Sequence, residues 1–234
     1  MRQNNFSIPS SPAQLSNSES GNVFLIILMG IILFAALSFS ISRGMRSDTT
    51  SNLSNQEASL AAADILAYAQ KTERAVNRLR RKGVSENDIS FDQSYVAGYA
   101  HGQPDTHKVF TTTSGAASWQ SPPEGANDGS DWTFTGETCI ADMGTGATGC
   151  DSDAVSNEEL IAALDNIDTT VCTEINDRLG ITGILADTGG GVDTTKYQGT
   201  FADGTEIILT GGPFSAACFS RAGNNYFYFA LIER

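Results

Sequence analysis

Basic residues are scarce in this sequence. The 14 Lys and Arg residues are outnumbered by 27 Asp and Glu residues, which gives a formal net charge of −13. The imbalance lies in the later part of the chain, where five basic residues face 22 acidic ones from Gly83 onward. A region this acidic repels the phosphate backbones of DNA and RNA. We therefore exclude nucleic acid as a partner.

The residues and motifs that catalysis or metal binding needs are also lacking. The two histidines, His101 and His107, lie in a loop with Asp105 between them, and no further ligand follows at a metal-binding spacing. The glycines at 189–191 lack the Lys and Ser/Thr of a phosphate-binding loop, and no serine lies in a GxSxG motif. We predict no enzyme activity, no cofactor and no metal site.

Cysteine occurs four times, and no two cysteines have the CxxC spacing of zinc and redox sites. Cys139, Cys150, Cys172 and Cys218 all lie in the later part of the chain. An even number of cysteines there predicts disulfides formed in an oxidising compartment. Four cysteines allow three connectivities, of which we favour Cys139 with Cys150 and Cys172 with Cys218.

Charged residues are absent from 22–42, NVFLIILMGIILFAALSFSIS, which follows a polar leader over 1–21. A helix of this length can cross the roughly 30 Å core of a bilayer, because each residue adds about 1.5 Å. We predict a membrane-spanning or membrane-packing helix at 22–42. The alternative is a buried core helix, although such helices usually keep one polar side.

A linker and an amphipathic helix are predicted over 43–83. From Leu53 to Lys82 apolar or small residues recur at steps of three and four, with charged residues between them. Gly83 is the natural end of this helix, because glycine readily adopts the left-handed conformation of a helix cap. The residues expected to face the core are Ala58, Ala61, Ile65, Ala69, Thr72, Val76 and Leu79.

Residues 84–234 are predicted to form a β-rich domain with disulfides. A helix is expected over 156–179, where a capping-box pattern precedes an apolar stripe that ends at Gly180. The last two strands, 216–220 and 226–232, should form a hairpin whose second strand is central or covered. Further short strands are expected at 89–91, 95–96, 109–110, 132–136 running into 139–140, 197–201 and 206–209.

The predicted fold class is therefore α+β. A long N-terminal helix, with a membrane-spanning half and an amphipathic half, leads into a small antiparallel β-sheet domain with one additional helix. The whole order of parts resembles a type IV pilin or a type II secretion pseudopilin. In that family a prepilin peptidase cuts after a glycine that precedes the apolar helix. The resemblance implies cleavage after Gly21, which makes Asn22 the first mature residue.

The resemblance implies a structural function. In the family, a glutamate at the fifth mature position neutralises the N-terminal amine of a neighbouring subunit, and this chain has Ile26 there. This departure favours a minor or tip-located subunit over a repeating one. The expected partners are other pilin-like subunits, membrane lipid and prepilin peptidase.

Two alternatives remain open. One is a single-span membrane anchor that presents an exported binding or adhesion domain and does not assemble. The other is a membrane-tethered hydrolase. The basic residues that flank 22–42 weakly favour a cytoplasmic domain, whereas the cysteines favour export. We expect a single-pass inner-membrane protein whose C-terminal domain is periplasmic or extracellular.

Overall fold

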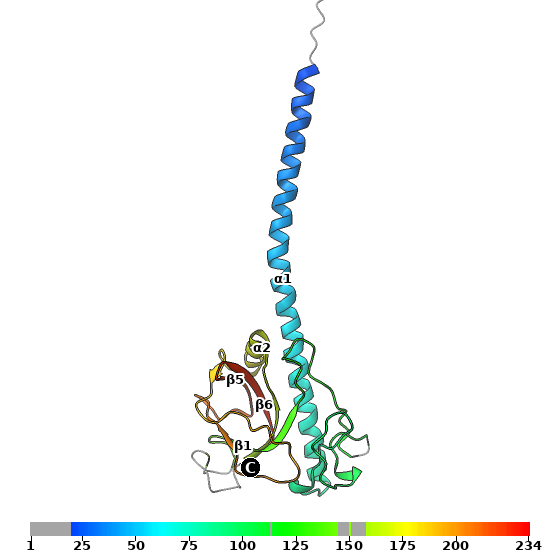
Figure 1. Ribbon diagram of the computed structural model, residues 1–234, viewed down its shortest axis with the longest axis vertical. Helices are drawn as coiled ribbons and strands as arrows, with labels where there is room; N and C mark the ends of the chain where they lie inside the picture. Colours follow the sequence, from blue (N-terminus) through cyan, green and yellow to red (C-terminus); the bar gives the residue numbers. More distant parts are fainter. Residues whose placement is uncertain (1–19, 113, 145–149, 151–157) are drawn as a thin grey trace, which may run out of the picture. The chain divides into compact units, whose positions relative to one another are not determined.

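The computed structural model describes residues 20–112, 114–144, 150 and 158–234, and for 20–24 and 34–53 it describes the backbone only. The chain divides into two compact units, Met1–Asn52 and Leu53–Arg234. Helix α1 (Ser20–Arg81) begins in the first unit and ends in the second. The second unit contains every other described helix and strand (Figure 1).

The amphipathic part of α1 packs as the periodicity predicts. All seven residues of the predicted stripe are buried. Four apolar members are completely inaccessible to solvent: Ile65, Ala69, Val76 and Leu79. Gly83 adopts a left-handed conformation with φ +87°. The amide of Val84 donates to the carbonyl of Leu79, which satisfies one of the last helix carbonyls. The predicted helix and its end are confirmed.

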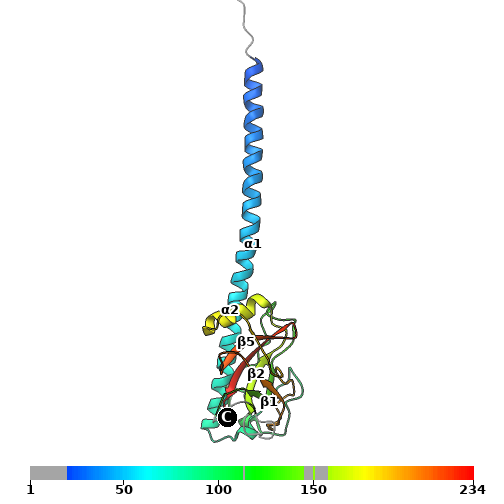
Figure 2. The same ribbon diagram turned by 90° about the vertical axis from the view of Figure 1, so that its left-hand side faces the viewer.

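Six strands form one mixed sheet that curls into a half-barrel (Figures 1 and 2). Their order across the sheet is β3-β5-β6-β2-β1-β4. The strands are β1 (Thr133–Ile140), β2 (Glu158–Leu164), β3 (Leu185–Ala186), β4 (Thr205–Ile207), β5 (Ala216–Arg221) and β6 (Asn224–Ile232). The hairpin β5-β6 is confirmed, and β6 lies inside the sheet between β5 and β2.

The predicted fold class is wrong on two points. The sheet is not purely antiparallel, because β1 pairs with β4 and β3 pairs with β5 in parallel. In each parallel pair a long connection, rather than a tight turn, separates the two strands along the chain. The residue pattern of a short strand does not show in which direction it will run. In addition, no helix among the residues searched is long and apolar enough to cross a membrane.

The helix predicted over 156–179 is wrong in its first half. Glu158–Leu164 is strand β2, buried along its whole length, and the positions 156–157 lie outside the described residues. Helix α2 covers only Thr169–Leu179, where Asp168 caps its first turn by accepting from the amides of Thr170 and Val171. A central strand is covered on both faces, so its residues are apolar in a continuous run. Such a run also contains apolar residues at helical spacings of three and four.

Both faces of the sheet are covered. α1, α2 and alternate residues of β2, such as Leu160 and Ala162, form one core, in which Phe91 stacks on Phe134 with ring centroids 4.4 Å apart. The opposite face packs Ile161 and other alternate strand residues into a second core. The expected strands at 89–91, 95–96, 109–110 and 197–201 are loops instead, apart from a bridge between Ser90 and Lys108. These loops contribute apolar and aromatic side chains to the first core rather than adding strands.

Two disulfides cross-link the second unit. Cys172 of α2 bonds to Cys218 of β5, and Cys139 of β1 bonds to Cys150. The favoured pairing is therefore confirmed. The two disulfides are consistent with an oxidising, exported environment.

Candidate functional site

Each imidazole of the histidine loop contacts an oxygen atom of the same loop. His101 Nδ1 lies 3.1 Å from the carbonyl oxygen of Tyr99, and His107 Nδ1 lies 3.0 Å from Gln103 Oε1. Asp105 instead pairs with Lys108. Among the described residues, no group of three or more His, Cys, Asp and Glu could hold a metal ion.

The sheet contains two adjacent buried carboxylates that sequence reasoning missed. Glu158 and Glu159 open strand β2 and are at most 2% exposed. Glu159 Oε2 accepts from the amide of Ile140 at 2.7 Å, whereas Oε1 has no hydrogen-bond partner among the described residues. Burial raises the pKa of Glu159 to about 8, with the charge of Glu158 adding to the rise. The only sequence signal was an acidic pair placed directly before an apolar strand.

The raised pKa of Glu159 predicts that stability falls as pH rises. The folded state binds more protons than the unfolded state between the ordinary value of 4.5 and about 8. The free energy of unfolding should therefore fall across this window, by up to about 1.4 kcal/mol per pH unit. Urea unfolding between pH 4 and pH 9 measures the slope.

Two variants separate Glu159 from other acidic groups. Glu159→Gln should flatten the slope and be more stable than the natural chain at pH 9. Glu137→Gln changes a half-exposed glutamate of β1 and is the control for removing one acidic side chain from the sheet. Equal slopes in all three proteins would show that Glu159 ionises without a penalty.

Among the described residues, the largest group of exposed apolar side chains lies near the start of α1. Eight large apolar side chains there, over 25–33, have exposed fractions between 48% for Leu28 and 64% for Ile31. Consecutive helical residues point in all directions around the axis, so this segment is apolar on every side. The members are Leu25, Ile26, Ile27, Leu28, Met29, Ile31, Ile32 and Leu33, named here the apolar collar.

An apolar collar without cover is unfavourable in water. Each square ångström of apolar surface removed from water contributes about 25 cal/mol, and soluble monomers rarely expose contiguous apolar patches of this kind. The collar contains no ionisable group. Its chemistry is therefore that of a packing surface and not of a reactive site.

The structure describes the side chains of some of the remaining predicted site residues and only the backbone of others. The four cysteines form the two disulfides, and Gly21 and Asn22 lie in the part of α1 for which the backbone alone is described. The arrangement thus offers an apolar helical surface on one unit and a disulfide-linked sheet on the other. Comparisons of the chain with protein-family models, with curated proteins and with solved structures find no match.

Proposed function

We propose that the protein is a minor structural subunit of a pilin-like filament or a type II secretion apparatus, and that it joins its neighbours through the apolar collar. The observation that carries this proposal is the exposure of the collar on every side of α1. A helix that is apolar all round needs apolar neighbours, and the helices of other subunits supply them.

Three further features support a structural role. The second part of α1 is amphipathic and packs one face into its own domain, whereas the collar in the first part is exposed. Ile26 brings no charge into a helix bundle, where an unpaired carboxylate would cost several kcal/mol. The two disulfides suit a domain that works in an oxidising compartment outside the cytoplasm.

Processing by a prepilin peptidase is part of this proposal. Cleavage after Gly21 would place the collar within a few residues of the mature N-terminus at Asn22. The chain produced with and without a prepilin peptidase is therefore expected to differ in mass by residues 1–21. Gly21→Trp should abolish the difference, because a bulky side chain replaces the hydrogen at the cleaved position.

Mass spectrometry of the intact chain and of its N-terminal peptide reads the result directly. A peptidase-dependent start at Asn22 supports the proposal. An uncut Met1 in both samples, or a cut near Ser40, contradicts it and favours the alternative of an anchored or secreted binding domain.

If subunits assemble through the collar, introducing one charged side chain into the collar should weaken the assembly. With a photocrosslinking amino acid at Met29, the chain in its native cells should form adducts with other subunits. Ile27→Glu should reduce these adducts at least about tenfold, because a carboxylate buried among apolar helices is costly. Leu60→Glu is the matched control, since Leu60 is also an exposed α1 residue, at 68%, and lies outside the collar.

The crosslinked adducts show whether the collar contacts other protein subunits or lipid. Protein adducts that disappear in Ile27→Glu and persist in Leu60→Glu support assembly. Adducts with lipid alone, or protein adducts that Ile27→Glu leaves unchanged, would count against the proposed interface.

A further inference from the structure

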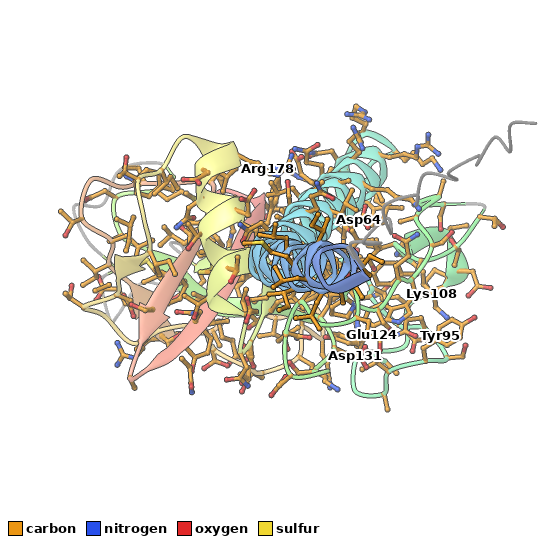
Figure 3. All side chains as sticks on the ribbon, turned by 90° about the horizontal axis from the view of Figure 1, so that it is seen from above. Asp64, Tyr95, Lys108, Glu124, Asp131 and Arg178 are labelled. Carbon is orange, nitrogen blue, oxygen red and sulfur yellow. A yellow bond between two sulfur atoms is a disulfide. The ribbon has the colours of Figure 1, made fainter. Side chains whose placement is uncertain are left out.

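The loops between α1 and β1 line an open cavity of 350 Å³ that no function discussed above uses. Its volume falls within the range of about 300–1,000 Å³ that is typical of small-molecule sites. Figure 3 places two of its lining residues, Tyr95 and Lys108, close together on the loops and away from Arg178 of α2. The side chains that matter for recognition are Asp92, Tyr95, Asp105, Lys108, Phe110 and Trp119.

The polar groups of the cavity form a three-residue ion-pair network. Lys108 Nζ lies 3.0 Å from Asp92 Oδ2 and 3.0 Å from Asp105 Oδ1. The ammonium has three N–H groups, so the pair of carboxylates leaves one for another acceptor. Each carboxylate also keeps lone pairs that can accept further hydrogen bonds. The network carries a net charge of −1 and presents both donors and acceptors.

An aromatic surface stands beside this network. The Tyr95 side chain is 77% exposed, which is high for a tyrosine. Its position is set by a tight loop, in which Gln93 Oε1 accepts from the amides of Tyr95 and Val96 and Gln93 Nε2 donates to the carbonyl of Val96. Tyr95 is therefore presented outward by a hydrogen-bonded loop.

Two more rings complete the aromatic wall. Phe110 and Trp119 are half-buried and meet edge to face, with ring centroids 5.4 Å apart. Both line the same cavity as Tyr95. The lining therefore contains two rings packed on each other, and Tyr95 adds an exposed ring.

Charge narrows the class of ligand. An anion is repelled by the net charge of −1 at the network and by the acidic domain around it. A cation would have to compete with Lys108, whose ammonium already occupies the space between the two carboxylates. The favoured ligand is therefore neutral, rich in hydroxyl groups and apolar on one flat side.

A pyranose sugar combines these properties. Its ring presents a face of C–H groups that can stack on an aromatic ring, and its edge carries neighbouring hydroxyl groups that donate to carboxylates and accept from an ammonium. We propose that this cavity binds a neutral pyranose, with the sugar ring against Tyr95 and its hydroxyl groups on Asp92, Asp105 and Lys108. This inference does not depend on the proposed assembly function.

The test is titration of the full chain, kept in solution with a sugar-free detergent, with the methyl glycosides of glucose, galactose, mannose and N-acetylglucosamine. Saturation-transfer NMR detects weak binding, and tryptophan fluorescence reports on Trp119 together with the buried Trp132. Sorbitol is the matched ligand control, because it offers similar hydroxyl groups without the flat ring face. At least one pyranose should bind saturably in the millimolar range.

Variants connect binding to this cavity. Tyr95→Ala should weaken the sugar's affinity at least about tenfold, because it removes the stacking face from an exposed loop. Lys108→Met should weaken it as well, whereas Leu60→Ala removes an exposed apolar side chain elsewhere and should have no effect. A circular dichroism spectrum identical to that of the natural chain shows that Tyr95→Ala is folded.

The outcomes separate clearly. Saturable pyranose binding that depends on Tyr95, with no binding of sorbitol, supports the proposal. Absence of binding by all four glycosides, binding equal to that of sorbitol, or binding unchanged in Tyr95→Ala would overturn it. None of these results bears on cleavage after Gly21 or on adducts at the collar, so the two proposals fail independently.

Discussion

The double variant Cys172→Ala/Cys218→Ala is expected to lose about 4 kcal/mol of unfolding free energy. The two cysteines are 46 residues apart and completely buried, where α2 lies on β5. A disulfide that closes a long loop restricts the unfolded chain strongly, so its loss stabilises the unfolded state. Because a domain of this size has only about 5–15 kcal/mol of stability, the effect is large.

Urea unfolding of the variant against the natural chain measures this loss. Cys139→Ala/Cys150→Ala is the matched control, because its sequence separation is 11 and the expected loss is smaller, about 3 kcal/mol. A smaller loss for the longer loop than for the shorter one would contradict the chain-entropy argument for this domain.

Asn176→Ala is expected to destabilise the domain by about 3 kcal/mol. Asn176 is completely buried in α2, and its amide hydrogen-bonds three backbone groups: Nδ2 donates to the carbonyls of Gly183 and Cys218, and Oδ1 accepts from the amide of Cys218. Each hydrogen bond contributes about 1 kcal/mol, and leaving its buried partner unsatisfied costs more. Alanine would leave all three backbone groups without this partner.

The measurement is again chemical unfolding, with two comparison variants. Asn176→Asp has nearly the same shape but turns both donors into acceptors that face carbonyl oxygens, so it should be at least as destabilising as alanine. Asn77→Ala changes a half-buried helical asparagine whose Nδ2 donates to Glu73 Oε1, and a loss below about 0.5 kcal/mol is expected. Equal losses at Asn176 and Asn77 would refute the role assigned to Asn176.

Local sequence patterns determined several parts of this structure. The buried stripe of α1 follows from residues spaced at three and four, and its end follows from Gly83. The β5-β6 hairpin follows from two strand-like segments around a short turn containing Ala222 and Gly223. The disulfide pairing was also anticipated, although four cysteines alone permit other connectivities.

Tertiary structure decided the features that depend on distant neighbours. Residues 158–164 satisfied a helical spacing, and only their place between β1 and β6 makes them a strand that is buried on both faces. The same burial raises the pKa of Glu159, which no local pattern reveals.

The candidate sites divide in the same way. The exposed apolar collar is an uncharged run that sequence alone makes visible, because its chemistry resides in consecutive residues. The cavity beside Tyr95 joins side chains up to 27 positions apart, from Asp92 to Trp119, in loops for which the sequence in part predicts strands. Periodicity encodes which face of one element is apolar, whereas the meeting of separate loops depends on how the whole domain packs.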